Sequence, residues 1–389
     1  MRRAETVNAL TCRKEDFRLE PGVHFLNCAY LGPISRRTEE AGIAGLARKR
    51  SPTDFPARAF YDDCDRLRER FAALIGGAAR HVAILPSVSY GIATAARNLP
   101  LGKGRDVVLL GEQFPSNVYV WRRRADEEDA RVRVVPRPGP PPCGARWNER
   151  ILHAIDADTA VVALAPTHWT DGTRFDVAAI GARAREVGAA FVLDGSQSVG
   201  AVPLDVGEVK PDALVCAGYK WLLGPYGIAL AHFGERFDHG VPLEETWIAR
   251  EGSEDFRGLV DYEEGYAEGA VRFDVGERSD FIHVPMMIAA LEQLLEWGPP
   301  RIRDYCVSLL SGVADAVRER GWPVEDDAWR GGNILGIGLP PDRDPGALQR
   351  RLEDARVYAS LRGSSLRVSP NVYNDAADID ALAEVVLGR

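Results

Sequence analysis

The stretches "FVLDGSQSVG" (residues 191–200) and "VCAGYKWLLGPYG" (residues 215–227) decide how this sequence is interpreted. Each begins with apolar residues typical of a buried strand and then reaches a single ionisable residue, Asp194 in the first and Lys220 in the second. The apolar neighbours of Lys220 predict a desolvated amine, whose pKa falls and which becomes a better nucleophile. The two stretches therefore predict an acid and an amine at the ends of two buried strands.

Short apolar runs alternate with amphipathic segments over most of the sequence. Strands are expected at residues 81–85, 106–110, 131–135, 160–165, 189–194, 213–217 and 227–233, and helices at 89–97, 116–128, 149–154 and 177–187. The prolines and glycines of residues 137–147 predict a loop. This alternation predicts an α/β fold with a mostly parallel sheet covered on both faces, whose ligand lies at the carboxyl ends of the strands.

The pattern changes after about residue 280. Two long helices are expected at residues 283–298 and 301–321, followed by strands at 333–339 and 364–370 with a helix at 345–353 between them. This order predicts a smaller C-terminal α+β domain, residues 281–389, after a large domain of residues 36–280.

Composition excludes several classes of function. The protein has 389 residues and a net charge of −9, so no general affinity for nucleic acid or for an anionic membrane surface is expected. Six cysteines without a CxxC pair and seven histidines without an HxxxH pair predict no metal site. With no signal peptide and no apolar run of about 18 residues, the protein is expected in the reducing cytoplasm.

One cofactor uses both a buried acid and a buried amine. Pyridoxal 5'-phosphate binds covalently to a lysine, and a carboxylate keeps its pyridine nitrogen protonated so that the ring accepts electrons. Taken singly, Asp194 is equally well explained as a turn residue or helix N-cap, and Lys220 as a surface lysine. Taken together, the two residues predict a pyridoxal-phosphate site.

The segments "DGSQSVGAVPLDV" and "PDALVCAGYKWLLGPYG", with "EQFPSNVYVW" upstream and "LRVSPNVYND" downstream, resemble a known family. They are similar to the class V pyridoxal-phosphate enzymes of fold type I, which include cysteine desulfurases, kynureninase, isopenicillin-N-epimerase-like proteins and several aminotransferases. The resemblance spans most of the sequence and implies a large domain with a mostly parallel seven-stranded sheet. It also implies that residues 1–35 form a segment lining the mouth of the active site.

The resemblance assigns roles around the ring of the cofactor. Lys220 matches the Schiff-base lysine, which also moves the proton at the substrate Cα. Asp194 matches the acid that pairs with the pyridine nitrogen, and Gln197 matches the residue that hydrogen-bonds the phenolic oxygen. Phe114 matches the residue that covers one face of the ring.

The resemblance also implies a phosphate site. The backbone N–H groups of Val88 and Ser89, at a helix N-terminus, would bind the phosphate, although Ser87 also suits simple capping. Tyr219 occupies the position of a further phosphate ligand. In the family a Gly-Thr element from a neighbouring subunit completes the site; here that role passes to Ser279 or Arg278, which implies a homodimer with shared active sites.

The remaining assignments concern a small amino-acid substrate. Thr170 matches a polar contact near the phenolic oxygen and the substrate. Arg367 matches the arginine that binds the α-carboxylate, with Arg362 as the alternative. Asn27 and Tyr30 fall in the segment that lines the mouth and are expected to touch the substrate.

The reaction stays open at this point. The loop before Arg367 carries Ser364 and Ser365 where a desulfurase needs a cysteine, which disfavours persulfide chemistry. An aminotransferase-like enzyme is favoured, ahead of a C–S or C–C lyase and of an epimerase-like enzyme. A non-catalytic relative is disfavoured because Lys220, Asp194 and Gln197 are all retained.

Overall fold

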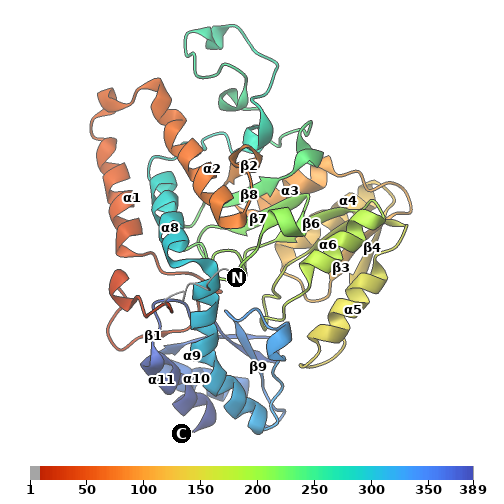
Figure 1. Cartoon of the computed structure of the whole chain (residues 1–389), viewed down its shortest axis with the longest axis vertical. Coiled ribbons are helices and arrows are strands. Elements are labelled where there is room, and N and C mark those ends of the chain that lie inside the picture. Colours follow the sequence, from red (N-terminus) through yellow and green to blue (C-terminus); the bar gives the residue numbers. More distant parts are fainter. Residues whose placement is uncertain (1–8, 389) are drawn as a thin grey trace, which may run out of the picture.

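The computed structural model describes residues 9–388, so the first eight residues of the predicted segment 1–35 and Arg389 lie outside it. Its centre is a seven-stranded sheet of order β2-β8-β7-β6-β5-β3-β4 (Figure 1). The strands are β2 (Val82–Leu85), β3 (Asp106–Leu110), β4 (Arg131–Val135), β5 (Thr159–Leu164), β6 (Ala190–Asp194), β7 (Ala213–Ala217) and β8 (Ala229–Phe233). Strand β8 runs antiparallel to β2 and β7, and the other neighbours are parallel. The predicted α/β fold with a mostly parallel seven-stranded sheet is confirmed.

Helices cover both faces of this sheet, because its strands are apolar on both sides. In β6, for example, Phe191 and Leu193 enter one hydrophobic core while Ala190 and Val192 enter the other. The first core contains residues of α2 (Asp62–Ile75), α5 (Gly144–Ala154), α6 (Val177–Glu186) and α8 (His283–Trp297). The second contains residues of α3 (Val88–Asn98) and α4 (Tyr119–Glu127).

Two helices of the structure, α1 (Arg36–Arg48) and α2, are not among the helices predicted from the sequence. Helix α1 begins where the Ser35 hydroxyl accepts a hydrogen bond from the backbone N–H of Thr38. Both helices pack against α8, beside which they lie in Figure 1. Helix α8 therefore joins the packing of the large sheet although it follows residue 280, and the domain boundary there stays a prediction.

The C-terminal part of the molecule forms a separate hydrophobic core (blue in Figure 1). Its helices are α9 (Pro299–Glu319), α10 (Pro345–Asp354) and α11 (Ala376–Leu387). Strands β9 (Leu335–Gly338), β11 (Ser360–Arg362) and β12 (Ser365–Val368) form an antiparallel sheet of order β11-β12-β9. None of the helices within residues 9–388 is both long and apolar enough to cross a membrane.

Helix α5 begins earlier than the sequence predicts, inside the segment expected to be a loop. The carboxylate of Glu325 accepts hydrogen bonds from the backbone N–H groups of Cys143 and Gly144, both at 3.0 Å. These groups are the unpaired donors at the start of the helix, so a residue far along the sequence caps it. Such a cap has no local sequence signal.

The segment before α1 links the two parts of the molecule. Its strand β1 (His24–Phe25) pairs with β10 (Val357–Tyr358) of the C-terminal part. Further along, the N–H of Gly32 donates to the carbonyl of Tyr219 at 2.8 Å. A Cβ atom at Gly32 would lie 2.2 Å from the carbonyl oxygen of Lys220, so only glycine allows this approach. A short helix, α7 (Val206–Val209), lies between β6 and β7.

Candidate active site

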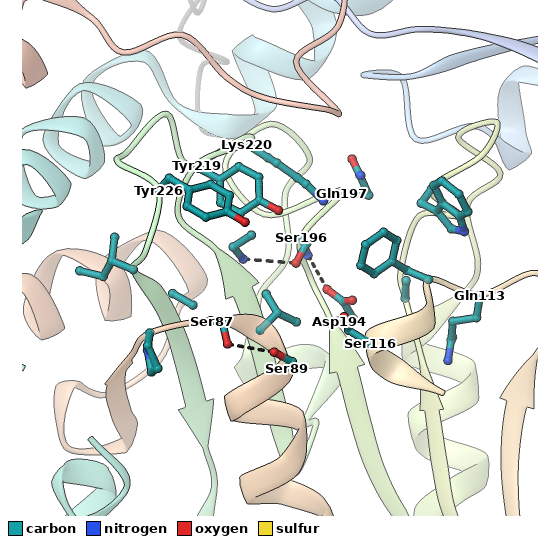
Figure 2. Close-up of a pocket in the computed structure, with 18 of the residues that line it drawn as sticks. Ser87, Ser89, Gln113, Ser116, Asp194, Ser196, Gln197, Tyr219, Lys220 and Tyr226 are labelled. Carbon is teal, nitrogen blue, oxygen red and sulfur yellow. Dashed lines mark hydrogen bonds between the residues drawn. The ribbon is translucent and has the colours of Figure 1, made fainter. Parts of the chain in front are cut away.

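A cavity of about 240 Å³ opens at the carboxyl ends of the central strands (Figure 2). It lies between the end of β6, the turn after β7 and the N-terminus of α3. Most of the predicted cofactor-binding residues line it, namely Val88, Ser89, Phe114, Asp194, Gln197, Tyr219 and Lys220. The fold therefore brings together residues that lie far apart in the sequence, where the rule for parallel sheets places a ligand.

Lys220 supplies an amine that is almost completely buried. Its Nζ lies 5.2 Å from the centre of the Phe114 ring and 5.5 Å from that of Tyr219. Among residues 9–388 this nitrogen has no hydrogen-bond acceptor. Burial lowers the pKa of Lys220, while the nearby carboxylate of Asp194 acts to raise it. Because burial is the larger effect, the neutral and nucleophilic form of the amine is favoured.

Asp194 lies at the last position of β6 and is buried. Its Oδ1 accepts one hydrogen bond, from the backbone N–H of Ser196 at 3.0 Å. The other carboxylate oxygen has no donor among the described residues. Figure 2 shows the carboxylate below the amine of Lys220, and both groups line the cavity. One oxygen of Asp194 thus remains available to a ligand.

The side chain of Gln197 is held at both ends. Its Nε2 donates to the carbonyl of Ala29 at 3.0 Å, and its Oε1 accepts from the indole of Trp221 at 2.9 Å. These bonds fix the orientation of the amide. Since an amide nitrogen carries two hydrogens, one donor remains for a ligand in the cavity.

Helix α3 points its N-terminus at the cavity. The Ser87 hydroxyl accepts from the backbone N–H of Tyr90 at 3.2 Å, so capping occurs as its sequence suggests. The hydroxyls of Ser87 and Ser89 lie 3.0 Å apart (Figure 2). No backbone acceptor among residues 9–388 takes the N–H groups of Val88 and Ser89. The helix N-terminus therefore retains donors and a positive dipole end for an anion.

A second cavity, of about 540 Å³, adjoins the first and shares Phe114, Gln197 and Lys220 with it. The predicted substrate residues Arg367 and Tyr30 line this cavity, and so does Arg362. Arg367 is only 1% exposed. Its Nη1 donates to the carbonyl of Trp169 at 2.8 Å, whereas its Nε and Nη2 are buried without a partner within residues 9–388.

Thr170 does not line either cavity. Its hydroxyl is engaged by the guanidinium of Arg137 at 3.1 Å and by Nδ1 of His168 at 2.8 Å. Arg137 also forms an ion pair with the buried carboxylate of Asp171. Thr170 thus belongs to a polar network behind the wall, whereas His168 and Trp169 line the cavity, and the contact of Thr170 with the ligand stays a prediction.

Ser279 and Arg278 also lie outside the two cavities. The Ser279 hydroxyl donates to the carbonyl of Phe60 at 2.5 Å and borders a third cavity near α2. Arg278 is buried against Asp274, with Nη1 to Oδ2 at 2.8 Å. Within one subunit neither residue reaches the N-terminus of α3, so the predicted phosphate contact of Ser279 depends on a neighbouring subunit.

Asn27 does not line either cavity. Its side-chain oxygen accepts a hydrogen bond from the Ser360 hydroxyl at 2.9 Å, and its backbone bridges to Ser369. Asn27 thus links the N-terminal segment to the C-terminal part, and its contact with the substrate stays a prediction. Tyr30, three residues on, is exposed and lines the second cavity together with Leu31.

Several residues of the cavity wall were not predicted. They are Gln113, Ser116, Trp169, Ser196 and Tyr226. Ser196 and Tyr226 fall inside the two quoted stretches, so their closeness to Asp194 and Lys220 was the available signal. Gln113 donates to two carbonyls, of Asn117 and Ala163, and leaves its buried Oε1 without a partner among the described residues.

Metal ligands are not clustered in the described part of the molecule, where three or more His, Cys, Asp or Glu side chains are nowhere placed to share an ion. The ionisable side chains that line the two cavities are the carboxylate of Asp194, the amine of Lys220 and the guanidiniums of Arg362 and Arg367. Tyrosines and His168 line them as well.

The family model named "Aminotransferase class-V" matches residues 48–244, just over half of the sequence. The chain belongs to the class V aminotransferase family. The matched region contains the whole seven-stranded sheet together with Asp194 and Lys220. The resemblance inferred from the quoted segments is confirmed, and the protein is a class V aminotransferase family enzyme.

Curated relatives within the class V family carry different names. The protein is 28% identical over 308 residues to "Uncharacterized aminotransferase YcbU" of Bacillus subtilis, covering 79% of this sequence and 78% of the relative. It is 25% identical over 380 residues to isopenicillin N epimerase of Streptomyces clavuligerus, covering 95% of each. Kynureninases and a cysteine desulfurase also match.

Solved structures share the class V fold at low identity. An apo cysteine desulfurase from Thermococcus onnurineus NA1 superposes with a TM-score of 0.82 at 18% identity, covering 97% of this protein and 98% of that one. A C-DES mutant, with glycine covalently linked to its pyridoxal-phosphate cofactor, also has a TM-score of 0.82, with 96% and 99% covered. The family uses pyridoxal phosphate, which the C-DES structure contains.

Proposed function

We propose that this protein is a pyridoxal-phosphate-dependent aminotransferase that acts on the α-amino group of a small amino acid. The observation that carries the proposal is one cavity that contains both the unpaired amine of Lys220 and an unpaired oxygen of Asp194. Each group is costly to bury without a partner, and a single ligand with an electrophilic carbon and a ring nitrogen pairs with both.

The residues present fit this cofactor. Lys220 would hold it covalently through Nζ. The free oxygen of Asp194 would accept a hydrogen bond from the protonated pyridine nitrogen. The N–H groups of Val88 and Ser89 would bind the phosphate at the positive end of α3. Phe114 would cover the ring, because its own ring already forms an apolar wall beside the amine.

When bound, the cofactor supplies a protonated ring that draws electrons from a bond at the substrate Cα. The ionised carboxylate of Asp194 favours that protonated state through its charge. Once the substrate's amino group has displaced it from the cofactor, the amine of Lys220 would take the Cα proton and return it, a task suited to a lysine whose pKa is lowered by burial. Aromatic side chains of Phe114, Trp169 and Tyr219 exclude water from this transfer.

The substrate carboxylate would be bound by Arg367. Its unpartnered Nε and Nη2 form one edge of the guanidinium, which matches the two oxygens of a carboxylate. Its Nη1 is already fixed by the carbonyl of Trp169. Binding at this fixed edge would orient the Cα–H bond toward Lys220.

Persulfide chemistry has little support in the arrangement of cysteines. The turn between β11 and β12 carries Ser364 and no thiol. Cys28 lies beside the lysine loop, with its Sγ 3.8 Å from the carbonyl oxygen of Lys220. Burial raises the pKa of Cys28 to about 12, so its reactive thiolate is suppressed. A lyase that cleaves a C–S or C–C bond of the substrate, or an epimerase-like enzyme, remains the second candidate, since curated relatives carry those names.

The first experiment tests the cofactor. Purified wild-type protein incubated with pyridoxal phosphate should turn yellow and show a visible absorption band that Lys220→Ala abolishes. Lys103→Ala is the matched control, because that lysine is exposed on the surface, and it should keep the band. A band of unchanged position and intensity in Lys220→Ala would refute the proposal.

The second experiment separates the reactions. Loaded enzyme is mixed with single amino acids in the absence of a keto-acid acceptor. An aminotransferase releases one keto acid per site and stops, with loss of the visible band. A lyase continues to release product over many turnovers and keeps the band. Formation of the opposite stereoisomer at Cα, with exchange of the Cα hydrogen and no keto acid, identifies an epimerase.

The proposal includes a homodimer in which a neighbouring subunit brings Ser279 to the phosphate site. Light scattering should give twice the mass of one subunit, and a fully active monomer would contradict this part.

The proposal also includes a location in the reducing cytoplasm. The six cysteines of the structure, none of which forms a disulfide, support it.

A further inference from the structure

Two arginines project from the same face of one hairpin. In the antiparallel pair β11-β12, Ser360 lies opposite Arg367 and Arg362 lies opposite Ser365. Arg362 and Arg367 are therefore diagonal neighbours, and diagonal positions share a face of the sheet. Both side chains line the second cavity, next to Lys220.

Neither guanidinium has an acidic partner in the part of the molecule that the structure describes. The Nη1 of Arg367 donates to the carbonyl of Trp169, and the Nη1 of Arg362 donates to the carbonyl of Leu361, its neighbour in the sequence. No ion pair involves either arginine within residues 9–388, and no Asp or Glu belongs to the wall of this cavity. The wall is thus uniformly cationic or neutral.

The positive charges of Arg362 and Arg367 repel each other. Burial lowers the pKa of Arg367 to about 9, and the positive charge of Arg362 acts in the same direction. Burial also lowers the pKa of Arg362. Both arginines add to the lowering of the pKa of Lys220. Arg367 is buried and Arg362 is half-buried, so each guanidinium is stabilised by a counter-charge, and one carboxylate at Arg367 leaves the charge of Arg362 without a partner.

The rest of the wall is mainly aromatic. It consists of Ala29, Tyr30, Leu31, Phe114, Trp169, Tyr219 and Tyr226, with Gln197. The guanidinium carbon of Arg362 lies 5.9 Å from the centre of the Trp169 ring. Between the two cations, this apolar surface suits a run of methylene groups.

We propose that the substrate is an amino acid whose side chain ends in a second carboxylate. Arg367 binds the α-carboxylate through its free Nε and Nη2 edge, and Arg362 binds the distal carboxylate. The proposal rests on the function proposed above for the chemistry at the amino group, whereas the charge recognition depends only on the cavity.

Titration calorimetry with non-reacting ligands tests this recognition directly. The probes are glutarate, which has two carboxylates, and its monoamide, which has the same length and one carboxylate. The protein is wild type incubated with pyridoxal phosphate, together with Arg362→Gln and Arg362→Lys. The matched control is Arg343→Gln, since Arg343 also lies beside a tryptophan, with its guanidinium carbon 5.2 Å from the Trp322 ring, and does not line the cavity.

Wild type and Arg343→Gln should bind glutarate at least tenfold more tightly than the monoamide. Arg362→Gln should lose this preference by weakening glutarate binding alone, and Arg362→Lys should keep part of it. Equal affinities of wild type for the two probes would overturn the proposal, as would an equal loss of affinity for both in Arg362→Gln.

Failure of this inference can be told apart from failure of the proposed function. A visible band that depends on Lys220, together with no preference for glutarate, overturns the inference alone. A preference for glutarate that depends on Arg362, without any such band, supports the charge recognition and overturns the cofactor proposal alone.

Discussion

The side-chain amine of Lys220 lies 5.2 Å from the centre of the Phe114 ring. The amine is therefore desolvated, because an aromatic ring occupies the space beside it that water would otherwise fill. Burial lowers its pKa, and the carboxylate of Asp194 partly offsets that effect. The reactivity of Lys220 is therefore set jointly by burial and by one neighbouring charge.

Asp194→Asn should lower the pKa of Lys220 further, because it removes the negative charge that stabilises the protonated amine. The pH midpoint for labelling of Lys220 by an amine-specific reagent should move to lower pH, as measured by mass spectrometry of the labelled peptide. The variant should also retain pyridoxal phosphate poorly and lose turnover. Asp194→Glu keeps the charge and is the control; a midpoint that does not move in Asp194→Asn would show that the two groups are uncoupled.

Arg367→Leu should reduce kcat/KM for the amino-acid substrate. A hydrogen bond to a charged group contributes about 1.5–3 kcal/mol, and every 1.4 kcal/mol corresponds to a factor of about ten. The expected loss is thus about tenfold to a hundredfold, carried mainly by KM, and steady-state kinetics measures it. An unchanged kcat/KM would show that another residue binds the substrate carboxylate, and Arg362 would be tested next.

Asp274→Asn should destabilise the fold. The buried carboxylate of Asp274 pairs with both Arg68 and Arg278 and accepts the backbone N–H of Ile84 at 2.8 Å. Removal of its charge leaves two buried guanidiniums uncompensated, a loss of about 3–5 kcal/mol in the free energy of unfolding. Urea unfolding followed by circular dichroism measures it. Asp304→Asn, at an exposed ion pair, should change stability by less than about 1 kcal/mol, and a similarly small effect at Asp274 would contradict the prediction.

His232 should make the fold sensitive to acid. Its ring lies 5.5 Å from that of His81, and its Nδ1 is buried without a partner among the described residues. Burial, followed by the charge of His81, lowers the pKa of His232 to about 4 from an ordinary value of 6.5. The stabilisation is present above pH 6.5 and is lost as the pH falls toward 4, because the unfolded protein binds the proton first.

Between pH 7 and pH 5 this effect should remove about 2 kcal/mol from the free energy of unfolding. The measurement is urea unfolding at a series of pH values, with His232→Gln as the comparison. The variant should show a shallower decline over this range. Parallel curves for the two proteins would show that His232 titrates normally.

The large sheet was predictable because its strands are short apolar runs separated by amphipathic helices. The end of β6 at Asp194 and the turn after β7 at Lys220 follow from this pattern, since a parallel sheet brings the carboxyl ends of its strands to one edge. The start of α5 was not predictable, because Glu325, which caps it, lies in a distant part of the sequence.

The same distinction separates the predicted site residues. Asp194 and Lys220 reach the cavity because strand ends position them. Thr170 lies on an irregular loop whose geometry depends on Arg137, a partner that no periodic pattern reveals. Asn27 is held by Ser360, again across a long sequence separation. Residues positioned by regular elements were thus easier to place than those fixed by tertiary hydrogen bonds.

The N-terminal segment contacts two parts of the molecule. Its strand β1 pairs with β10 of the C-terminal part, and the N–H of Gly32 donates to the carbonyl of Tyr219 beside Lys220. The segment therefore joins the part of the molecule that carries Arg362 and Arg367 to the loop that carries Lys220, through backbone hydrogen bonds at both ends.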